Sequence, residues 1–468
     1  MTLIDDLRAA LGAAQVLTGA DAAGFGREWT GHYRWNPLAV VRPASTDEVA
    51  QVLRLASAAR VPVVPVGGNT GLNGGTFAEG ALMLSLARMN RIREIRPAAR
   101  VAVVEAGVIL SRIHEAAAGH GLSFPLTFGA KGSAMVGGFL STNAGGSNVL
   151  RYGNTRALVL GIEAVLADGR VLNLMSALHK DNTGYDLRDL LIGAEGTLGV
   201  ITAAVLKLVP TPRAFATATV AAPDLDAALA LLNRLQVESG GAVEAFEYMP
   251  ASFMARLARY RPDLRPPFAQ TPPATLLVEI ASTMPRDTTP GPDGALPLVG
   301  LLEAALAEGM AAGEVIDAVV ARTEAQRRAM WERREAAAEV SLNTPPLVDT
   351  DIALPLDGLS PFLAAMTRRL AELDPGASET VVAHLGDGNI HYTAYPSRDD
   401  PAHLAAIRAA VAEEAVARGG SFSAEHGIGL SKRATMAAHK DPVALEVMRA
   451  IKAALDPAGI LNPGKVLP

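Results

Sequence analysis

The sequence has no cysteine and no long apolar run. Without cysteine among its 468 residues, it cannot form disulfides, thiolate zinc sites, iron–sulfur clusters or cysteine nucleophiles. No apolar run approaches the roughly 18 residues that a membrane helix needs, so we predict no transmembrane segment. The net charge of −6 provides no basic surface of the kind that binds nucleic acid.

The N-terminal stretch MTLIDDLRAALGAAQ lacks the features of a targeting peptide. It carries acidic residues early and has no basic region before an apolar core. We therefore predict a cytoplasmic protein. A length of 468 residues and a hydrophobic content of 49% predict two or three domains with substantial cores.

The stretch 381–393, VVAHLGDGNIHYT, predicts a β-hairpin. Its β-branched and apolar arms flank Asp387-Gly388, a strong signal for a two-residue type I′ turn. That turn would place His384 opposite His391 on one face of the sheet. Directly opposed residues have Cβ atoms about 5 Å apart, so both imidazoles could reach one metal ion.

A second short stretch, Glu425-His426-Gly427, strengthens the metal hypothesis. Two histidines on a hairpin are, on their own, more often a hydrogen-bonded surface pair. With Glu425 they form a His₂Glu ligand set that suits Zn²⁺, with Mn²⁺ and Fe²⁺ as alternatives. His426 would then remain a free imidazole beside the metal, suited to proton transfer near neutral pH.

Glycine-rich loops dominate the first half of the chain, and each lies next to a predicted strand. Such loops let several main-chain N–H groups converge on an anion, so together they favour a large ligand such as a dinucleotide. The first loop alone is equally compatible with a flexible turn. No G-x-G-x-x-G follows a strand and opens a helix, so a Rossmann site is not supported. The loops span residues 67–75, 128–138, 141–146 and 193–199.

Local patterns predict the elements around these loops. Ser45 and Glu48 indicate a helix through Arg60, followed by a strand over 61–66. Composition shifts near Pro210-Thr211-Pro212, a predicted domain boundary. Beyond it, strand-like and helix-like segments alternate, which predicts an antiparallel sheet covered by helices. We also predict a helix over 109–121, a hairpin over 161–174, proline-rich loops over 262–273 and 285–297, and a charged helix over 322–342.

Eight motifs, taken in order, resemble one family. The chain is similar to the FAD-linked D-2-hydroxyacid dehydrogenases, the group containing D-lactate dehydrogenase, the flavin subunit of glycolate oxidase and D-2-hydroxyglutarate dehydrogenase, within the vanillyl-alcohol-oxidase superfamily. Each motif is weak alone, but their combination over nearly the whole chain is specific. They occupy residues 65–71, 129–133, 142–146, 180–187, 195–199, 384–391, 425–427 and 462–465.

The resemblance implies an α+β fold in two parts. Residues 1–213 would form a two-part FAD-binding domain of the vanillyl-alcohol-oxidase type, and 425–468 would return to it. Residues 214–424 would form an α+β cap domain with an antiparallel sheet, which carries the substrate.

The resemblance also implies noncovalent FAD. Some superfamily members attach FAD through a histidine in the first glycine loop, where this chain has Asn69. The implied FAD-binding residues are Val66, Gly67, Gly68, Asn69, Thr70, Gly71, Leu72, Pro125, Gly132, Ser133, Gly137, Gly138, Thr142, Asn143, Gly145, Glu195, Gly199, Val200, Ile201 and Asn462.

For the chemistry, the resemblance implies a metal held by His384, His391 and Glu425, with His426 as the base. Arg334 and Thr393 would bind the substrate. The implied reaction oxidises a D-2-hydroxy acid to the 2-oxo acid by hydride transfer to flavin. An unidentified acceptor, such as an electron-transfer flavoprotein, a quinone or a cytochrome, would reoxidise the flavin, and a homodimer is one compatible assembly.

Three positions depart from the pattern expected of the 2-hydroxyglutarate-type enzymes. That pattern has a lysine near Asp349, a threonine near Ala338 and an amide near Thr393. A second substrate carboxylate is therefore less well served here, and lactate or malate are alternatives to 2-hydroxyglutarate.

Two other functions are compatible with parts of the sequence. A metal-dependent hydrolase would use the histidine hairpin but leave the glycine loops without a role. A non-catalytic flavin subunit of an electron-transfer complex would use the loops without oxidising a hydroxy acid.

Overall fold

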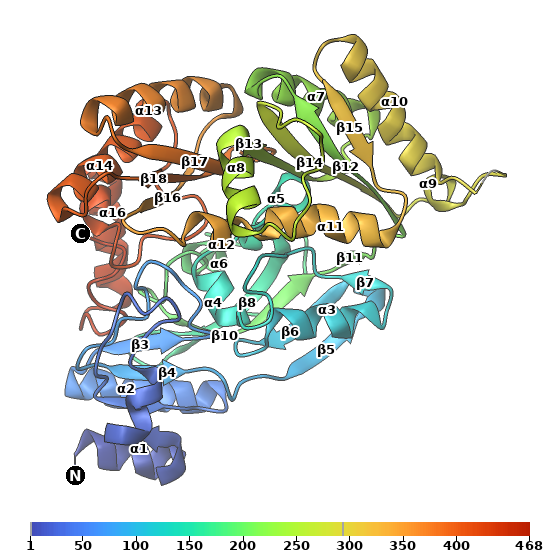
Figure 1. The fold of residues 1–468 in the computed structure, drawn as a ribbon. Coiled ribbons are helices and arrows are strands. Elements are labelled where there is room, and N and C mark those ends of the chain that lie inside the picture. The colour runs from blue at the N-terminus through green and yellow to red at the C-terminus, as the bar shows by residue number, and fades with distance from the viewer. Residues whose placement is uncertain (1, 293) are drawn as a thin grey trace. The chain divides into compact units, whose positions relative to one another are not determined.

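A computed structural model describes residues 2–292 and 294–468, and it divides the chain into two compact units (Figure 1). The first unit comprises Met1–Gly145, Gly153–Pro210 and Glu425–Pro468, and the second comprises Gly146–Tyr152 and Thr211–Ala424. Asp293, in the predicted loop over 285–297, lies outside the described residues.

The first unit contains a four-stranded sheet in the order β1-β2-β4-β3. Helix α2 (Thr46–Ala59) packs its apolar side on this sheet, since Val49 and Leu53 share a buried cluster with Val63. As predicted, Ser45 caps α2 by accepting a hydrogen bond from the Glu48 N–H. The strands are β1 (Val16–Leu17), β2 (Ala39–Val41), β3 (Val63–Val66) and β4 (Leu82–Ser85).

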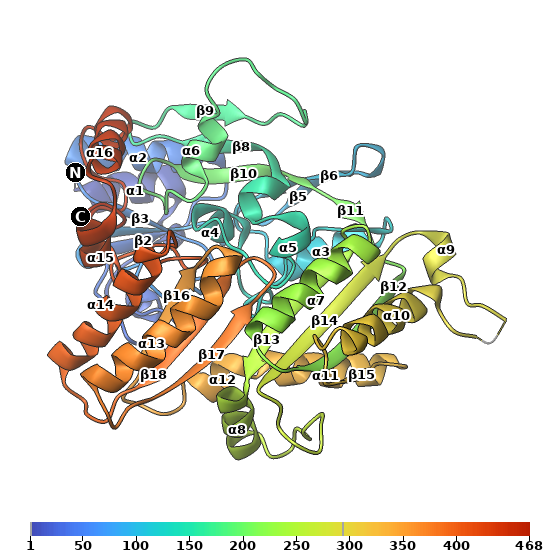
Figure 2. The same ribbon diagram turned by 90° about the horizontal axis from the view of Figure 1, so that it is seen from above.

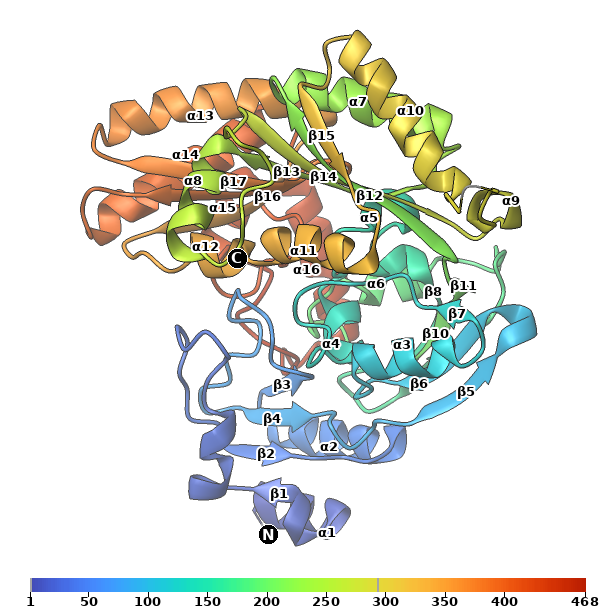
Figure 3. The same cartoon turned by 45° about the vertical axis from the view of Figure 1, so that its right-hand side comes forward.

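A five-stranded antiparallel sheet in the order β5-β6-β10-β8-β9 is the second large sheet of this unit, and Figure 3 shows β5, β6, β10 and β8. The predicted hairpin around Asp168-Gly169 is present as β8 and β9. Helices α3 (Leu110–Ala118) and α4 (Val136–Ser141) connect this sheet with the glycine-rich loops. Its strands are β5 (Ile92–Arg96), β6 (Val101–Glu105), β8 (Val159–Val165), β9 (Val171–Leu174) and β10 (Val200–Lys207).

The second unit is built on a seven-stranded antiparallel sheet in the order β15-β12-β14-β13-β17-β18-β16. The alternating segments of the sequence therefore form the predicted antiparallel sheet. Its strands are β12 (Ala214–Ala222), β13 (Val243–Pro250), β14 (Ala274–Ser282), β15 (Asp317–Val320), β16 (Val348–Ala353), β17 (Ser378–His384) and β18 (Asn389–Tyr395).

Helices cover both faces of this sheet (Figure 2). The larger apolar core lies under one set of helices, where Leu231, Phe362 and Ile407 are fully buried. A smaller apolar cluster containing Phe253 and Met330 lies on the opposite face. The first set is α7 (Leu225–Glu238), α10 (Pro297–Ala311), α13 (Leu359–Leu373) and α14 (Pro401–Ala417), and the second is α8 (Ala251–Tyr260), α11 (Glu324–Glu335) and α12 (Ala337–Ser341).

Two local predictions for this unit were wrong. The charged helix over 322–342 is interrupted at Ala336, which separates α11 from α12. The hairpin loop has four residues, because His384 pairs with Asn389 rather than with His391. In the predicted turn the Asn389 N–H would donate to the Gly386 carbonyl, but it donates to the Asp387 carboxylate at 3.1 Å instead.

Among the described residues, no helix is long and apolar enough to cross a membrane.

Candidate functional site

The glycine loops of the first unit carry a concentration of unusual backbone conformations. Asn69, Asn143, Glu195 and Asn462 all have left-handed φ values, between 40° and 55°. Each is one of the predicted FAD-binding residues. Non-glycine residues adopt this conformation at a cost, and such residues cluster at ligand sites.

Two of these loops touch each other through their main chains. A Cβ atom added to Gly68 would lie 2.0 Å from the carbonyl oxygen of Ser133, and one added to Gly67 would lie 3.3 Å from the Gly138 nitrogen. Only glycine allows this approach at Gly68. The structure thus brings the predicted loops around residues 67 and 133 into contact.

Asn462 carries an unsatisfied atom at the centre of these loops. Its side-chain amide donates to the carbonyls of Gly75 and Glu195, at 3.0 and 2.7 Å. Its buried Oδ1 makes no hydrogen bond within the described part of the chain. A buried acceptor without a partner costs free energy, so it fits a site in which a bound ligand supplies a donor.

The other predicted FAD-binding residues all belong to the first unit. They occupy the end of β3 and the loop after it, the segments before, within and after α4, and the residues at the start of β10. They are Val66, Thr70, Gly71, Leu72, Pro125, Gly132, Gly137, Thr142, Gly145, Gly199, Val200 and Ile201.

In the second unit, His384 and His391 come together on one face of the sheet. Their ring centroids are 5.4 Å apart and nearly perpendicular, and each offers a ligand atom within 4.8 Å of the other. His384 pairs with Asn389, and Asn389 shares the face of His391 two residues on. Although the register differs from the predicted one, His384 and His391 still lie on the same face of the sheet.

The carboxylate of Glu247, which the sequence analysis did not predict as part of the site, orients His384. Glu247 on β13 is fully buried, and its Oε1 lies 2.8 Å from Nδ1 of His384. Burial alone would raise the pKa of Glu247, but the charges of Arg334 and His384 outweigh it and lower that pKa to about 2. Since Glu247 is ionised, its carboxylate accepts the hydrogen bond and Nδ1 of His384 donates it.

Arg334, the predicted substrate-binding residue, pairs with the same carboxylate. Its Nε donates to Glu247 at 2.6 Å. Its Nη2 lies 3.4 Å from both ring nitrogens of His384, and thus along the lone-pair direction of neither. The Nη1 group makes no hydrogen bond to any residue that the structure describes, so it is the part of the guanidinium left for a ligand.

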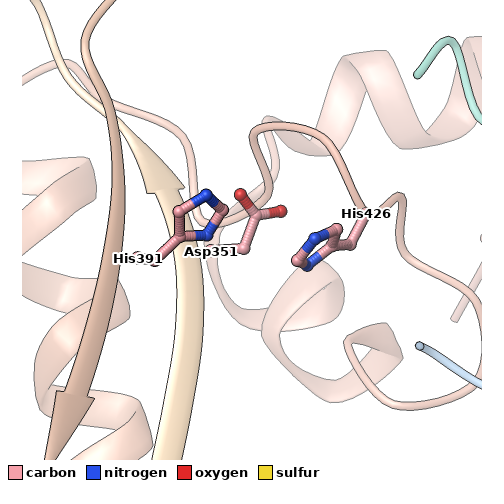
Figure 4. A group of neighbouring side chains, drawn as sticks. All are labelled: Asp351, His391 and His426. Atoms are coloured by element: carbon pink, nitrogen blue, oxygen red, sulfur yellow. The ribbon is translucent and has the colours of Figure 1, made fainter. Parts of the chain in front are cut away.

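Acidic side chains on the neighbouring strand were also missed. Asp351 pairs with His391 in the ladder, and the two offer ligand atoms within 4.8 Å of each other (Figure 4). Asn389 donates to Asp351 at 2.9 Å. Two residues earlier, Asp349 accepts a hydrogen bond from Thr393 at 2.8 Å. Alternation along the strand places both acids and His391 on one face, and only the pairing of β16 with β18 reveals this.

Glu425 and His426 stand in an irregular loop that begins the last part of the first unit. Figure 4 shows the side chain of His426 on this loop. The carboxylate of Glu195 accepts the N–H groups of Ile428 and Gly429 from this loop, at 2.7 and 2.8 Å. The glycines after His426 allow the turn, because Gly429 has a φ of 52°. The segment is thus a turn rather than a strand, as placing both side chains in one site requires.

Comparisons with known proteins match two stretches of the chain to two families. Residues 37–175 match the family described as "FAD binding domain", and residues 211–466 match "FAD linked oxidases, C-terminal domain". The structure is similar to p-cresol methylhydroxylase, with a TM-score of 0.75 at 17% identity over 99% of this chain and 96% of that one. It is also similar to 4-ethylphenol oxidase from Gulosibacter chungangensis, with a TM-score of 0.71 at 20% identity over 100% and 97%.

Proteins that are similar in sequence indicate a narrower group of enzymes than the structural comparisons do. The chain is 39% identical to the mitochondrial D-2-hydroxyglutarate dehydrogenase of Bos taurus, over 94% of this chain and 79% of the relative. It is 34% identical to the D-2-hydroxyglutarate dehydrogenase of Stutzerimonas stutzeri (strain A1501), over 99% and 98%.

Together, the fold and these matches define a flavin-linked oxidoreductase with the vanillyl-alcohol-oxidase fold. Within that class, the chain belongs to the family of FAD-linked D-2-hydroxyacid dehydrogenases. The predicted family and fold class are confirmed.

Proposed function

We propose that this chain oxidises a D-2-hydroxy acid to the corresponding 2-oxo acid with the help of a divalent metal. The observation that carries the metal assignment is the geometry of the second unit's sheet. There, Glu247 lies 2.8 Å from Nδ1 of His384, and His384 and His391 offer ligand atoms within 4.8 Å of each other. A carboxylate behind a ligating histidine is the usual second contact in metal sites.

FAD would be held noncovalently by the loops of the first unit. Residues 67–72 and 142–145 would surround the pyrophosphate, and the unsatisfied Oδ1 of Asn462 would face the cofactor. When bound, FAD accepts the hydride from the substrate carbon. Asn69 in place of a histidine supports a noncovalent attachment.

The metal would be held by His384, His391 and Glu425. Ser421 is bridged to Ala353 on β16, and Glu425 follows it by four residues. Four residues span at most about 14 Å, so the chain itself keeps Glu425 near the histidines' strands. Zinc suits this ligand set best, with manganese and iron as alternatives. A bound divalent ion would act as a Lewis acid toward the substrate oxygens.

The remaining roles fall to residues near the proposed ligands. A ring nitrogen of His426 would take the proton from the substrate hydroxyl as the hydride leaves. Arg334 would offer its Nη1 group to the substrate carboxylate, while its Nε stays on Glu247. Thr393 would line the site beside its acceptor Asp349.

The side chain of the substrate remains a choice among the D-lactate, D-2-hydroxyglutarate and D-malate classes. The face that holds His391 also carries Asp349 and Asp351. Carboxylates at these positions would disfavour a second substrate carboxylate by like-charge repulsion. This supports a monocarboxylic substrate such as D-lactate over the substrate named in the relatives.

The acceptor of the electrons, a cytoplasmic location and a homodimer remain predictions from the sequence. An electron-transfer flavoprotein, a quinone or a cytochrome would each suit a reduced flavin. The relatives include mitochondrial and bacterial proteins, so they do not choose a compartment.

The decisive experiment mixes purified protein anaerobically with D- and L-2-hydroxy acids, with and without a chelator, and follows the flavin absorbance. We expect bleaching by a D acid only, slowed by the chelator and restored by Zn²⁺ or Mn²⁺. Bleaching that ignores the chelator would refute the metal. A flavin that no 2-hydroxy acid bleaches would favour a non-catalytic flavin subunit, and metal-stimulated hydrolysis by flavin-free protein would favour a hydrolase.

A further inference from the structure

We propose that Glu195 is a positioning residue that holds the loop presenting His426, and that it acts on catalysis through this loop. The inference rests on the proposed role of His426 as the base. The sequence predicted a different role for Glu195, namely direct contact with FAD.

Both carboxylate oxygens of Glu195 accept hydrogen bonds from this loop. Its Oε1 accepts the Ile428 N–H at 2.7 Å, and its Oε2 accepts the Gly429 N–H at 2.8 Å. A carboxylate that receives two main-chain N–H groups in a buried position makes strong, charge-assisted hydrogen bonds. The two donors follow His426 by two and three residues, so the contact fixes the turn that carries the imidazole.

The Glu195 side chain is buried and closely packed against this loop. Glu195 is 9% exposed. A Cβ atom added to Gly427 would lie 2.6 Å from its Oε1, so Gly427 must lack a side chain for the loop to approach. Gly427 also has a φ of 71°, a conformation that favours glycine.

Asn73 is a second residue that holds this loop by hydrogen bonds. The side-chain amide of Asn73 donates to the carbonyls of His426 and Gly427, at 2.9 and 2.7 Å. The Asn73 carbonyl accepts the Leu430 N–H at 2.7 Å. Asn73 thus holds two carbonyls and the Leu430 N–H of the loop, and Glu195 holds the N–H groups of Ile428 and Gly429.

The main chain of Glu195 forms hydrogen bonds to two segments of the predicted FAD site. Its N–H donates to the Ser141 carbonyl at 2.8 Å, and its carbonyl accepts from Asn462 at 2.7 Å. Its φ of 51° is a left-handed conformation that these contacts maintain. One residue therefore joins the loop of His426 to two segments predicted to surround the cofactor.

Replacing Glu195 by glutamine tests the proposal. One oxygen would be exchanged for an NH₂ group that faces an N–H donor, so one of the two hydrogen bonds must break. We expect Glu195→Gln to keep its flavin and its KM within threefold, while kcat falls on the order of 100-fold, the loss typical of a displaced base. Glu79→Gln is a matched control, because Glu79 also accepts a main-chain N–H in this unit but lies far along the chain from the loop.

A double-variant cycle separates a positioning role from a general structural one. If Glu195 acts through His426, the variant Glu195→Gln/His426→Ala will turn over no more slowly than His426→Ala alone. Independent, multiplicative losses would overturn the proposal. Wild-type turnover by His426→Ala would instead refute the proposed base.

Amide hydrogen exchange gives a readout that does not depend on activity. In Glu195→Gln, exchange of peptides covering residues 425–431 should accelerate at least tenfold, and unchanged exchange there would overturn the proposal. If Glu195→Gln does not fold, Asn73→Ala provides a second test, because it removes the hydrogen bonds to the His426 and Gly427 carbonyls. It should show the same fall in kcat and the same faster exchange, and normal values of both would refute the inference.

Discussion

The buried carboxylate of Glu247 lies 2.8 Å from Nδ1 of His384, across two neighbouring strands of the second unit. This contact fixes which nitrogen of His384 carries the proton. It also links the proposed metal ligand to Arg334, because the same carboxylate accepts the arginine Nε–H at 2.6 Å. One acid thus sets the orientation of both a proposed ligand and a proposed substrate-binding group.

Glu247→Gln should therefore weaken metal binding. A neutral amide holds the His384 tautomer less firmly and leaves Arg334 without its counter-charge, so we expect a roughly 10- to 100-fold loss of metal affinity. Metal titration followed by competition with a chelator measures this loss.

Glu279→Gln is the control for Glu247→Gln. Glu279 lies on the same sheet and also pairs with an arginine, Arg327, at 2.6 Å, but its other hydrogen-bond partners, Thr217 and Trp331, are not proposed metal ligands. Each variant should lower the free energy of unfolding by about 2 kcal/mol, because each replaces the charged hydrogen-bond partner of a partly buried arginine with a neutral amide. Equal metal affinity in the two variants would contradict the role assigned to Glu247.

Gly68→Ala should abolish FAD binding. A Cβ atom at this position would lie 2.0 Å from the Ser133 carbonyl oxygen, so the two loops would have to separate. We expect less than about a tenth of the normal flavin content in the purified protein, because the predicted phosphate cradle depends on this approach. Flavin released on denaturation provides the measurement.

Gly24→Ala serves as the comparison for Gly68→Ala. No atom lies within 4 Å of a Cβ added at Gly24. This variant should purify with a normal flavin content, and normal flavin in Gly68→Ala as well would show that the loops do not need their close contact.

Asp349→Asn should change the preference among substrates. Removing one negative charge from the face that carries His391 reduces repulsion of a second substrate carboxylate. At an effective dielectric constant near 20, we expect kcat/KM for D-2-hydroxyglutarate relative to D-lactate to rise about tenfold. Steady-state rates with both substrates measure the ratio. An unchanged ratio would mean that the substrate's distal group lies elsewhere.

Acid should weaken the second unit through Asp374. Hydrogen bonds from Ser397 outweigh the effect of burial and, with those from His403 and the Gly376 N–H, lower the pKa of Asp374 below its ordinary value of 3.8. The folded form therefore binds this proton less readily than the unfolded form. Its contribution to stability is complete above about pH 4 and is lost as the pH falls toward the lowered pKa.

Urea unfolding at a series of pH values checks the contribution of Asp374. The Asp374→Asn variant should unfold at lower urea concentration than the wild type at pH 6, and the two midpoints should converge below pH 3. A constant difference between the midpoints would show that the ionisation of Asp374 contributes nothing.

The sequence determined the local features of this protein. The Ser45 cap of α2, the hairpin around Asp168-Gly169 and the glycine loops depend on residues that are neighbours along the chain. Local conformational preferences are set by short segments, so these features were predictable. The motifs also indicated the family, because eight of them occur in the expected order.

Tertiary structure decided the partners of the site. The sequence predicted His384 opposite His391, but the structure pairs His384 with Asn389. Glu247 precedes its partner His384 by more than a hundred residues, and no local pattern connects them. Strand order alone brings β13 beside β17, and it is a property of how the whole sheet buries its apolar faces rather than of any one segment.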